Sequence, residues 1–410
     1  MSTPAPDRRP AVRLVMVTKD NNNKVYEMAE NGDGTFTARF GRIGARLQER
    51  VYPSARWDAT YRAKTHKGYT DITALAAEDA AGGFEIADPT VAALVDRLRA
   101  AADSALRAQY LVAPDAVGAR QVAEAQAHLD ALARLAGDLE DDLRPDLVAA
   151  FDAHLLDLYR TIPRKMGNVR SHLLGHDLTP DQLADVLDAE QEALDRMAQR
   201  VRLADAPSRP TLHDALGFDL CRVTDERSLR RIRTMMGTHA DRLEGVLEVV
   251  HPRLRAQFEE HVAASRSKKA RLLWHGSRSE NWLSILETGL VLNPARAVIT
   301  GKMFGHGLYF ASSFQKSLGY TSLRGAFWTG HAADRGYLAL YDVHVGSPLT
   351  VDRHHAWCYE LTADRLAERT LLRRPDSLHA RAGQMLRHDE IVVYREAQAC
   401  PRYLVEVREA

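Results

Sequence analysis

The stretch Ala270-Arg-Leu-Leu-Trp-His-Gly-Ser277 decides how the C-terminal half of this chain folds. Its first five residues have the composition of a strand, and a small-residue turn follows at His275-Gly276-Ser277. Two later segments share this character: Gly305-His-Gly-Leu-Tyr-Phe-Ala311 and Glu390-Ile-Val-Val-Tyr394. Because polar groups beside glycine turns let a ligand approach the backbone, we predict that His275, Tyr309 and Glu390 line one cleft.

The length and charge of the chain limit its organisation. Its 410 residues carry no net charge, and this length allows two or three domains. Residues 8–70 hold thirteen Lys and Arg against six Asp and Glu, whereas residues 88–205 hold thirteen against twenty-one. This asymmetry suggests a basic N-terminal binding module followed by an acidic one, although two ordinary solvated surfaces would give the same counts.

The cysteines and the N-terminus indicate the compartment. Cys221, Cys358 and Cys400 are odd in number and lack metal-binding spacing, so we expect neither a disulfide framework nor a metal site. Met1–Pro10 has no apolar stretch, and no run approaches the roughly 18 apolar residues of a membrane span. We expect a soluble intracellular protein without signal peptide or membrane partner, cytoplasmic or nucleoid-associated in a bacterium and nuclear in a eukaryote.

The N-terminal part predicts a flexible tail over 1–10 and a small β-rich domain over 11–85. Val12, Leu14 and Met16 alternate with period two, and Asn31-Gly-Asp-Gly34 is a strong hairpin signal. A helix is predicted from Ser54 to His66, ended by Lys67-Gly68.

Residues 88–206 predict an all-α helical bundle. Helix starts are indicated at Asp88-Pro89-Thr90 and Leu178-Thr-Pro-Asp181. In each segment a side chain that can cap a helix stands next to a proline, and a proline suits the first turn. Gly137 is predicted to stop one helix. The residues of that helix that fall on one face are Val122, Ala125, Leu129, Leu132 and Ala136.

After a linker at Ala206–Pro210, residues 211–410 predict the third domain. Helices are expected around Asp225–Met236 and Asp241–Ser265. Apolar runs at 338–345, 391–394 and 403–407 supply further strands of a mixed or antiparallel sheet. The predicted fold class is therefore a multidomain α+β protein.

Several of these segments resemble the poly(ADP-ribose) polymerase family. Three segments resemble motifs of the catalytic domain of that family. They are Leu273-Trp-His-Gly-Ser-Arg-Ser-Glu-Asn281, Thr300-Gly-Lys-Met-Phe-Gly-His-Gly-Leu-Tyr-Phe-Ala311 and Glu390-Ile-Val-Val-Tyr-Arg-Glu-Ala-Gln398. Leu158-Tyr-Arg-Thr-Ile-Pro163 resembles a signature of its regulatory helical domain, and Phe40-Gly-Arg-Ile-Gly44 with Lys67-Gly-Tyr-Thr-Asp71 resembles its WGR domain. The resemblance implies a WGR domain over 11–85, a helical regulatory domain over 88–206 and an ADP-ribosyltransferase domain over 211–410.

The resemblance also implies residue roles. NAD would be the substrate, with no metal required, and Glu390, His275 and Tyr309 would be the catalytic set. The other residues implied to bind NAD are Gly276, Ser277, Asn281, Ser317 and Tyr320, and those implied on the acceptor side are Lys316, Met303 and His388. Physical chemistry agrees with Glu390, because a carboxylate assists an oxocarbenium-like glycosidic cleavage. Taken singly, each of these residues could instead be structural or solvated.

By the same resemblance, the N-terminal domain would bind DNA, in particular the ends of strand breaks. Phe40 stands where the WGR domain has Trp and keeps a stacking face without the N–H donor. The basic residues Arg39, Arg42, Lys64 and Lys67 could neutralise phosphates without sequence preference.

The sequence departs from the polymerase pattern near the acceptor site. Arg387-His388-Asp389 replaces the usual Leu-Tyr-Asn before the glutamate, the stretch from Gly383 to Arg387 is short, and Lys302 replaces an aromatic residue. We therefore keep three hypotheses: a DNA-activated enzyme that modifies itself, with other proteins as further candidate acceptors, a mono(ADP-ribosyl)transferase acting on protein or nucleic-acid ends, and a non-catalytic DNA-binding scaffold.

Overall fold

A computed structural model describes residues 9–73, 84–112, 114, 117–141, 144–174, 182–204, 210–292, 303–323, 333–370, 374–383 and 386–409. The chain divides into two compact units. The first combines Met1–Ala81 with Ser104–Ala204, and the second combines Gly82–Asp103 with Asp205–Ala410. The three domain ranges expected from the sequence stay predictions, and the long helix α2 (Pro89–Gln109) contributes residues to both units.

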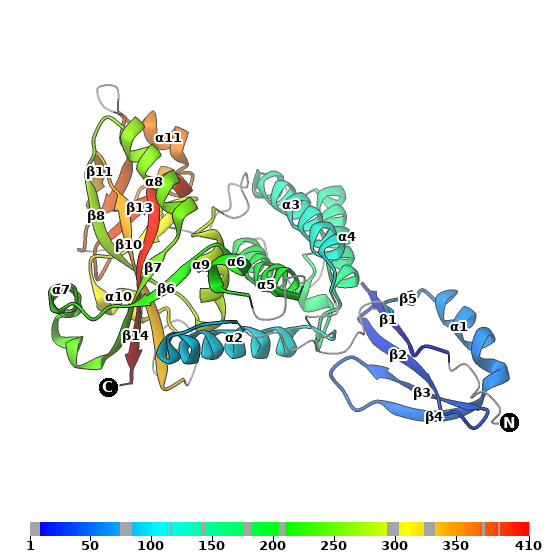
Figure 1. The fold of residues 1–410 in the computed structure, drawn as a ribbon. Coiled ribbons are helices and arrows are strands. Elements are labelled where there is room, and N and C mark those ends of the chain that lie inside the picture. The colour runs from blue at the N-terminus through cyan, green and yellow to red at the C-terminus, as the bar shows by residue number, and fades with distance from the viewer. Residues whose placement is uncertain are drawn as a thin grey trace. The chain divides into compact units, whose positions relative to one another are not determined.

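The first unit contains an antiparallel sheet, coloured blue in Figure 1, with the order β4-β3-β2-β1-β5 among its described residues. The strands are β1 (Val12–Thr18), β2 (Asn22–Glu30), β3 (Thr35–Arg42), β4 (Gln48–Pro53) and β5 (Thr70–Asp71). The hairpin at 31–34 is confirmed. The predicted helix is also confirmed, as a 3-10 turn at Ser54–Arg56 followed by α1 (Trp57–Thr65), and Gly68 ends it with a φ of 88°.

The two faces of this sheet are covered differently. On one face Trp57 of α1 packs against Leu14, Met28 and Phe36. On the other face Asn23 is fully buried, and its Nδ2 donates to the carbonyl oxygens of Arg164 at 3.3 Å and Met166 at 2.9 Å. The segment after α4 therefore satisfies the amide donor of Asn23, whose Oδ1 is buried without a hydrogen-bond partner among the described residues.

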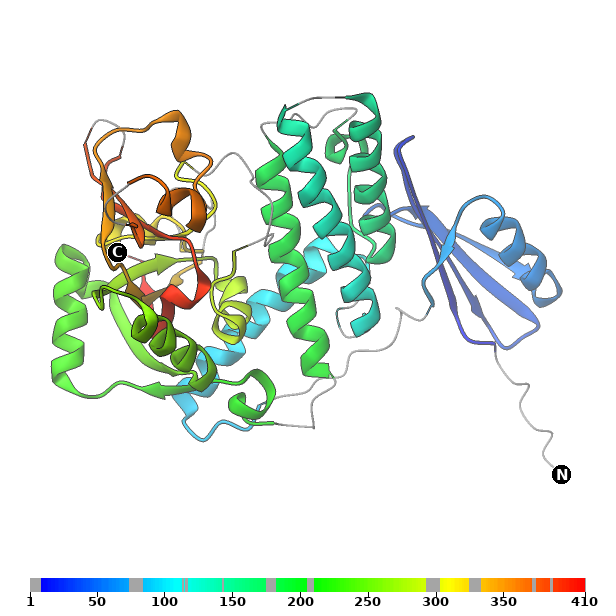
Figure 2. The ribbon, with the colours of Figure 1, turned by 90° about the horizontal axis from the view of Figure 1, so that it is seen from above.

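The helices α3 (Ala119–Asp141), α4 (Pro145–Thr161) and α5 (Leu183–Ala204) pack side by side in this unit (Figure 2). The predicted apolar face is confirmed for Ala125, Leu129, Leu132 and Ala136, which are buried, while Val122 is half-buried. Gly137 does not stop the helix, so that prediction was wrong. Glycine inside a helix costs only about 1 kcal/mol, which the packed face outweighs. The helix start at 178–181 and most of the linker at 206–210 lie outside the described residues.

The second unit holds the remaining elements. Its helices, after the N-terminal part of α2, are α6 (Leu212–Leu216), α7 (Glu226–Met236), α8 (Pro252–Ala264), α9 (Trp282–Thr288), α10 (Phe314–Leu318) and α11 (Ala363–Ala367). Its strands are β6 (Asp219–Arg222), β7 (Leu243–Val250), β8 (Ala270–Gly276), β9 (Leu308–Phe310), β10 (Arg335–His344), β11 (Pro348–Val351), β12 (Ser377–Ala380), β13 (Glu390–Val393) and β14 (Ala399–Arg408).

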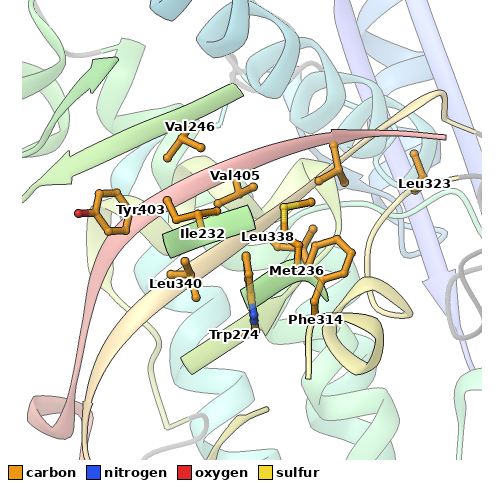
Figure 3. Close-up of a cluster of buried hydrophobic side chains, with 11 residues drawn as sticks. Ile232, Met236, Val246, Trp274, Phe314, Leu323, Leu338, Leu340, Tyr403 and Val405 are labelled. Carbon is orange, nitrogen blue, oxygen red and sulfur yellow. The ribbon is translucent and has the colours of Figure 1, made fainter. Parts of the chain in front are cut away.

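These strands form two sheets within the described residues. One is antiparallel throughout, in the order β6-β7-β14-β10-β8, and the other has the order β11-β12-β13-β9 with β11 and β12 parallel. The prediction of a mixed or antiparallel sheet is confirmed. Figure 3 shows the apolar cluster on the first sheet, where Trp274 of β8 meets Phe314 of α10 and Met236 of α7.

The structure corrects one predicted helix and confirms two others. Residues 241–250 form no α-helix, because a 3-10 turn (Gly237–Arg242) leads into β7 (Leu243–Val250), whose Val246, Leu247 and Val249 are buried. The helix begins only at Pro252, a residue suited to a first turn. The start of α2 is confirmed, since Asp88 Oδ1 accepts from Thr90 N at 2.8 Å. The helix predicted around Asp225–Met236 is confirmed as α7, and Asp225 caps it by accepting from Ser228 N at 2.8 Å.

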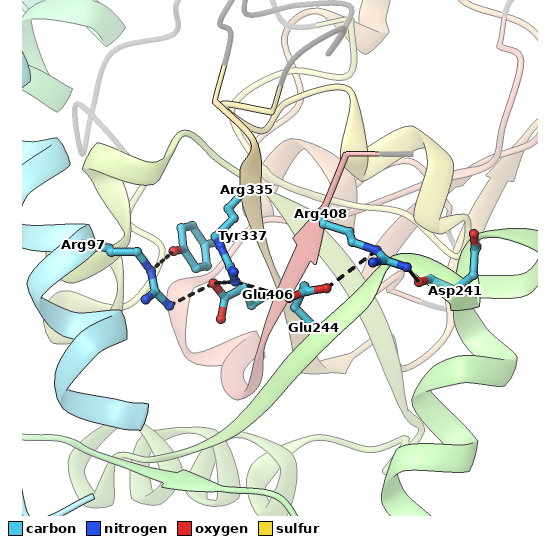
Figure 4. Close-up of polar contacts among 7 residues, drawn as sticks. All are labelled: Arg97, Asp241, Glu244, Arg335, Tyr337, Glu406 and Arg408. Carbon is cyan, nitrogen blue, oxygen red and sulfur yellow. Dashed lines mark hydrogen bonds and ion pairs between the residues drawn. The ribbon is translucent and has the colours of Figure 1, made fainter. Parts of the chain in front are cut away.

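Charged groups attach the first part of α2 to the strands of the second unit (Figure 4). Arg97 donates to the Tyr337 hydroxyl at 3.1 Å and to Glu406 Oε1 at 2.9 Å. Arg335 donates to the same Glu406 oxygen at 2.8 Å. Because the Glu406 side chain is only 8% exposed, the two guanidinium groups compensate a carboxylate that is largely withdrawn from water. No helix in the described part of the chain is long and apolar enough to cross a membrane.

Candidate active site

The three residues singled out first lie on three strands that meet. Tyr309 of β9 lies opposite Val392 of β13. Since side chains alternate along a strand and paired residues share a face, Tyr309 and Glu390 are on the same face of this sheet. The strand β8 joins β9 through a bridge in which Trp274 N donates to Ala311 O at 2.8 Å and Ala311 N donates to Trp274 O at 2.9 Å.

His275 follows this bridge directly. Its Nδ1 lies 3.0 Å from the Tyr309 carbonyl oxygen, so Nδ1 carries the proton and Nε2 is left as an acceptor. Burial lowers the pKa of His275, against the opposing effect of that hydrogen bond. A neutral imidazole in a fixed tautomer therefore occupies the end of β8.

Gly276 cannot carry a side chain. A Cβ built on it would lie 1.9 Å from the Ser317 carbonyl oxygen, which places α10 against the end of β8. The backbone of Trp274 bonds to Ala311 on the side away from β10, and residues two apart in a strand point their N–H and C=O groups the same way. The N–H and C=O of Gly276 therefore face outward from the sheet, as a donor and acceptor beside a surface without a Cβ.

Glu390 is held by a charged partner from α10. Lys316 Nζ lies 2.7 Å from Glu390 Oε1, and the two side chains are 15% and 11% exposed. Tyr320 is close enough to the same carboxylate for the charge of Glu390 to act on it. Burial first, and then this charge, raise the pKa of Tyr320. Its amide N donates to the Ser317 carbonyl oxygen at 3.2 Å. The short helix α10 and the turn that follows it thus bring Lys316, Ser317 and Tyr320 to Glu390 and Gly276.

Tyr309 is fixed through its hydroxyl, which donates to Gly305 O at 2.7 Å and accepts from Phe304 N at 3.1 Å. Gly305 has a φ of 71°, and a Cβ there would lie 2.4 Å from the Leu361 carbonyl oxygen, so only glycine fits this turn. The glycines before Tyr309 therefore shape the backbone around it, as the sequence predicts.

The structure places the other predicted residues with less detail. Asn281 Nδ2 donates to Ser277 Oγ at 3.2 Å, so these two side chains adjoin on the turn after β8. The Met303 carbonyl accepts from His354 Nε2 at 2.7 Å, and His388 is half-buried just before Glu390. Lys302 lies outside the described residues. The roles of all these residues stay predictions.

Sequence reasoning missed one pair of residues beside Glu390. His379 Nε2 lies 2.8 Å from Asp389 Oδ2, and Ala382 N donates to Asp389 Oδ1 at 2.8 Å. These two hydrogen bonds, that of Ala382 first, lower the pKa of Asp389. His379 pairs with Ile391 in the sheet, so the pair lies on the face opposite to Glu390 and fixes the start of β13. The ten-residue separation of His379 and Asp389 carries no motif, and only the β12–β13 pairing reveals it.

The residues predicted to bind nucleic acid lie in the first unit. Phe40 stacks on Tyr26 with ring centroids 5.4 Å apart, and Lys64 Nζ lies 3.9 Å from the Tyr26 centroid. Burial lowers the pKa of Lys64, with smaller effects from Lys67 and Lys24, so cations are gathered here. Arg42 instead donates to Asn21 O at 2.9 Å, to Asn21 Oδ1 at 2.7 Å and to the carbonyl of Gly167. Its guanidinium is engaged within the unit.

Comparison with known proteins identifies the second unit. Residues 228–409 match the model of the poly(ADP-ribose) polymerase catalytic domain. A putative poly [ADP-ribose] polymerase-like protein, 100L, of Invertebrate iridescent virus 6 is 34% identical over 152 residues, which cover 37% of this chain and 77% of the viral protein. Poly [ADP-ribose] polymerase 2 of Arabidopsis thaliana is 30% identical over 203 residues, 42% of this chain and 30% of the plant protein. The human protein of that name is 44% identical over 75 residues, 18% of this chain and 12% of its own length.

The second unit contains a catalytic domain of the ADP-ribosyltransferase class. This follows from the matched range 228–409, which includes the strands β8, β9 and β13 and the end of β8 at His275–Gly276. The chain belongs to the poly(ADP-ribose) polymerase family. The matches support the predicted ADP-ribosyltransferase activity, whereas the WGR and helical regulatory domains stay predictions. Within the part of the chain that the structure describes, no group of three or more His, Cys, Asp or Glu side chains is placed to hold a metal ion.

Proposed function

We propose that this protein transfers ADP-ribose from NAD to an acceptor, with Glu390 as the catalytic carboxylate. The observation that carries the proposal is the largely buried Glu390–Lys316 ion pair at 2.7 Å, beside a glycine edge that α10 closes. A buried carboxylate with one charged partner is an expensive arrangement for a fold, and such arrangements gather at functional sites.

Each part of NAD has a matching group. The outward N–H and C=O of Gly276 suit a primary carboxamide, which offers one acceptor and donors of its own. Tyr309 and Tyr320 would supply aromatic faces for the nicotinamide ring, and Ser317 a hydroxyl for its amide. The neutral His275, with Nε2 as acceptor, suits a ribose hydroxyl, and Ser277 with Asn281 adds polar groups on the same turn.

Glu390 would act on the bond that breaks. As nicotinamide leaves, positive charge develops on the ribose ring, and a fixed carboxylate stabilises that charge without reorganising at the moment of reaction. Lys316 holds the carboxylate in place. Together with Met303 and His388, it would contact the acceptor. Positioning of this kind contributes most when the reacting groups are already oriented.

We further propose that the first unit is a WGR-like domain with a helical regulatory partner, and that DNA breaks activate the enzyme, which modifies itself. The gathered cations around Lys64 support a phosphate-binding surface that includes Phe40 and Lys67. Arg39, which was also predicted to bind nucleic acid, lies on the opposite face of β3, with its Nε 3.8 Å from Glu49 Oε2. The hydrogen bonds of Arg42 argue that its role is within the unit.

A mono(ADP-ribosyl)transferase is the second candidate. Arg387-His388-Asp389 precedes Glu390, and β12 and β13 are joined by only nine residues, 381–389, closed by Asp389. A short connection leaves less protein to hold an ADP-ribose chain as acceptor.

Incubation of the full chain with labelled NAD tests these proposals, with and without broken duplex DNA. Label on the protein only with DNA supports activation, and equal labelling in both reactions contradicts it. Digestion to chain length separates polymer from single units. A complete lack of nicotinamide release would favour the non-catalytic scaffold.

A further inference from the structure

The helix α7 has two chemically different faces. Ile232 and Met236 are buried and point into the cluster with Trp274 and Phe314 (Figure 3). The residues of α7 that are exposed are Glu226, Arg227, Arg230, Arg231, Arg233 and Thr234. Four arginines within seven residues make this face strongly cationic in a chain whose overall charge is zero.

Most of this charge is uncompensated. Arg233 lies 4.0 Å from Glu226, and a backbone hydrogen bond first, then to a smaller degree the charge of Arg227, lower the pKa of Asp225. Within the described part of the chain, no acidic side chain lies within ion-pair distance of Arg227, Arg230 or Arg231. These three residues are spaced i, i+3 and i+4, so they are neighbours on one stripe of the helix. Like charges at this spacing destabilise a helix by about 0.2–0.5 kcal/mol per pair, so the stripe does not serve the stability of the fold.

The position of α7 relates this stripe to the active site. Its buried face packs on α10, whose Phe314 belongs to the same apolar cluster. Lys316, proposed to contact the acceptor, and Ser317, proposed to bind NAD, follow on α10. A ligand on the outer face of α7 would therefore lie on the same unit as the acceptor side, without occupying the site itself.

We propose that Arg227, Arg230 and Arg231 form a second nucleic-acid contact, which binds the phosphate backbone of DNA. Arginine presents a planar fork that matches phosphate oxygens with two hydrogen bonds. The exposed face of α7 carries no aromatic side chain for base stacking, so binding here would be independent of sequence and steeply dependent on salt. The inference goes beyond the proposed function, which assigns DNA binding to the first unit.

The test measures the affinity of the full chain for broken duplex DNA over a range of salt concentrations. The variant R227Q/R230Q/R231Q removes the charge and keeps good helix formers. A matched control, R120Q/R134Q/R353Q, removes the same charge from exposed arginines that are scattered over the chain. Both sets are also made with Lys64→Gln and Lys67→Gln, which weaken the DNA binding proposed for the first unit.

The plot of log affinity against log salt has a negative slope, and the α7 variant should reduce the magnitude of that slope by up to about 2.7, which is about 0.9 for each phosphate that the protein no longer neutralises. For equal affinities at 1 M salt, this corresponds at 0.1 M salt to an affinity decrease of about eightfold for one such phosphate and up to about 500-fold for three. The variant R227K/R230K/R231K should keep most of the slope, because the charge is retained.

Two results would overturn the proposal: an α7 variant that binds like the scattered control in both backgrounds, or one that has a lower affinity for ADP-ribose polymer but keeps its affinity for DNA. Nicotinamide release without DNA should be the same in the α7 variant as in the parent. Failure of the proposed enzymatic function would abolish that release in the parent as well, and would leave the binding measurement intact.

Discussion

Replacing Gly276 by Ala tests how the end of β8 and the helix α10 build the site. The new Cβ would lie 1.9 Å from the Ser317 carbonyl oxygen and 2.8 Å from its carbon, whereas real Cβ contacts essentially never fall below 3.0 Å. The oxygen therefore has to retreat by about 1.1 Å, and α10 has to move with it, because the obstacle is backbone.

The size of the effect follows from that displacement. Overpacking of this kind costs about 1–3 kcal/mol of stability, or roughly 2–12 °C in Tm for a unit of this size. Since α10 also carries Lys316, a misplacement of about 1 Å should lower kcat/KM for nicotinamide release by roughly a hundredfold. The decrease in activity should therefore exceed the decrease expected from the population of unfolded protein.

The assay combines nicotinamide release from NAD with a thermal melt. Gly383→Ala is the matched control, since a Cβ at Gly383 meets no atom within 4 Å, and it should change neither quantity appreciably. If Gly276→Ala behaved like Gly383→Ala, with activity within about threefold of the parent, steric closure of the site by Gly276 would be refuted.

The remaining predictions concern the charged groups and one helix. Lys316→Met should reduce nicotinamide release and destabilise the fold by about 3–5 kcal/mol, because it leaves the largely buried Glu390 without its charged partner. An unchanged thermal melt would show that the ion pair does not contribute to stability. Asp389→Asn should lower Tm at pH 7, because the ionised carboxylate stabilises the folded state. The difference in Tm between parent and variant should shrink as the pH falls below about 4, where a carboxyl with a lowered folded pKa becomes protonated. A pH-independent difference would exclude this cause. Gly137→Ala should raise the stability of the first unit by about 0.5–1 kcal/mol, because this glycine lies inside α3 with open space at its Cβ; chemical denaturation measures the change, and a lower stability would contradict it.

Local patterns predicted much of the fold. The hairpin at 31–34, the cap at Asp88 and the apolar face of α3 follow from a few neighbouring residues, and the structure has all of them. The error at 241–265 arose because β7 and α8 are both apolar-rich and follow each other directly, so one periodicity masked the other. Gly137 was over-interpreted, because tertiary packing decides whether a helix tolerates one glycine.

The site shows the same limit. His275, Tyr309 and Glu390 could be singled out because each adjoins a strand and a recognisable motif, and the structure places them on strands that meet. The His379–Asp389 pair and the close approach of Gly276 to Ser317 depend on which strands and helices become neighbours. No spacing in the sequence contains that information.

The central claim is that Glu390 drives the transfer of ADP-ribose from NAD. The most direct measurement is the rate of nicotinamide release and of label transfer by Glu390→Gln, a change that removes the charge and keeps the shape. We predict a decrease of at least a hundredfold in both rates with a folded protein, judged by an unchanged circular dichroism spectrum. A folded Glu390→Gln protein that transfers ADP-ribose at the parental rate would contradict this role of Glu390.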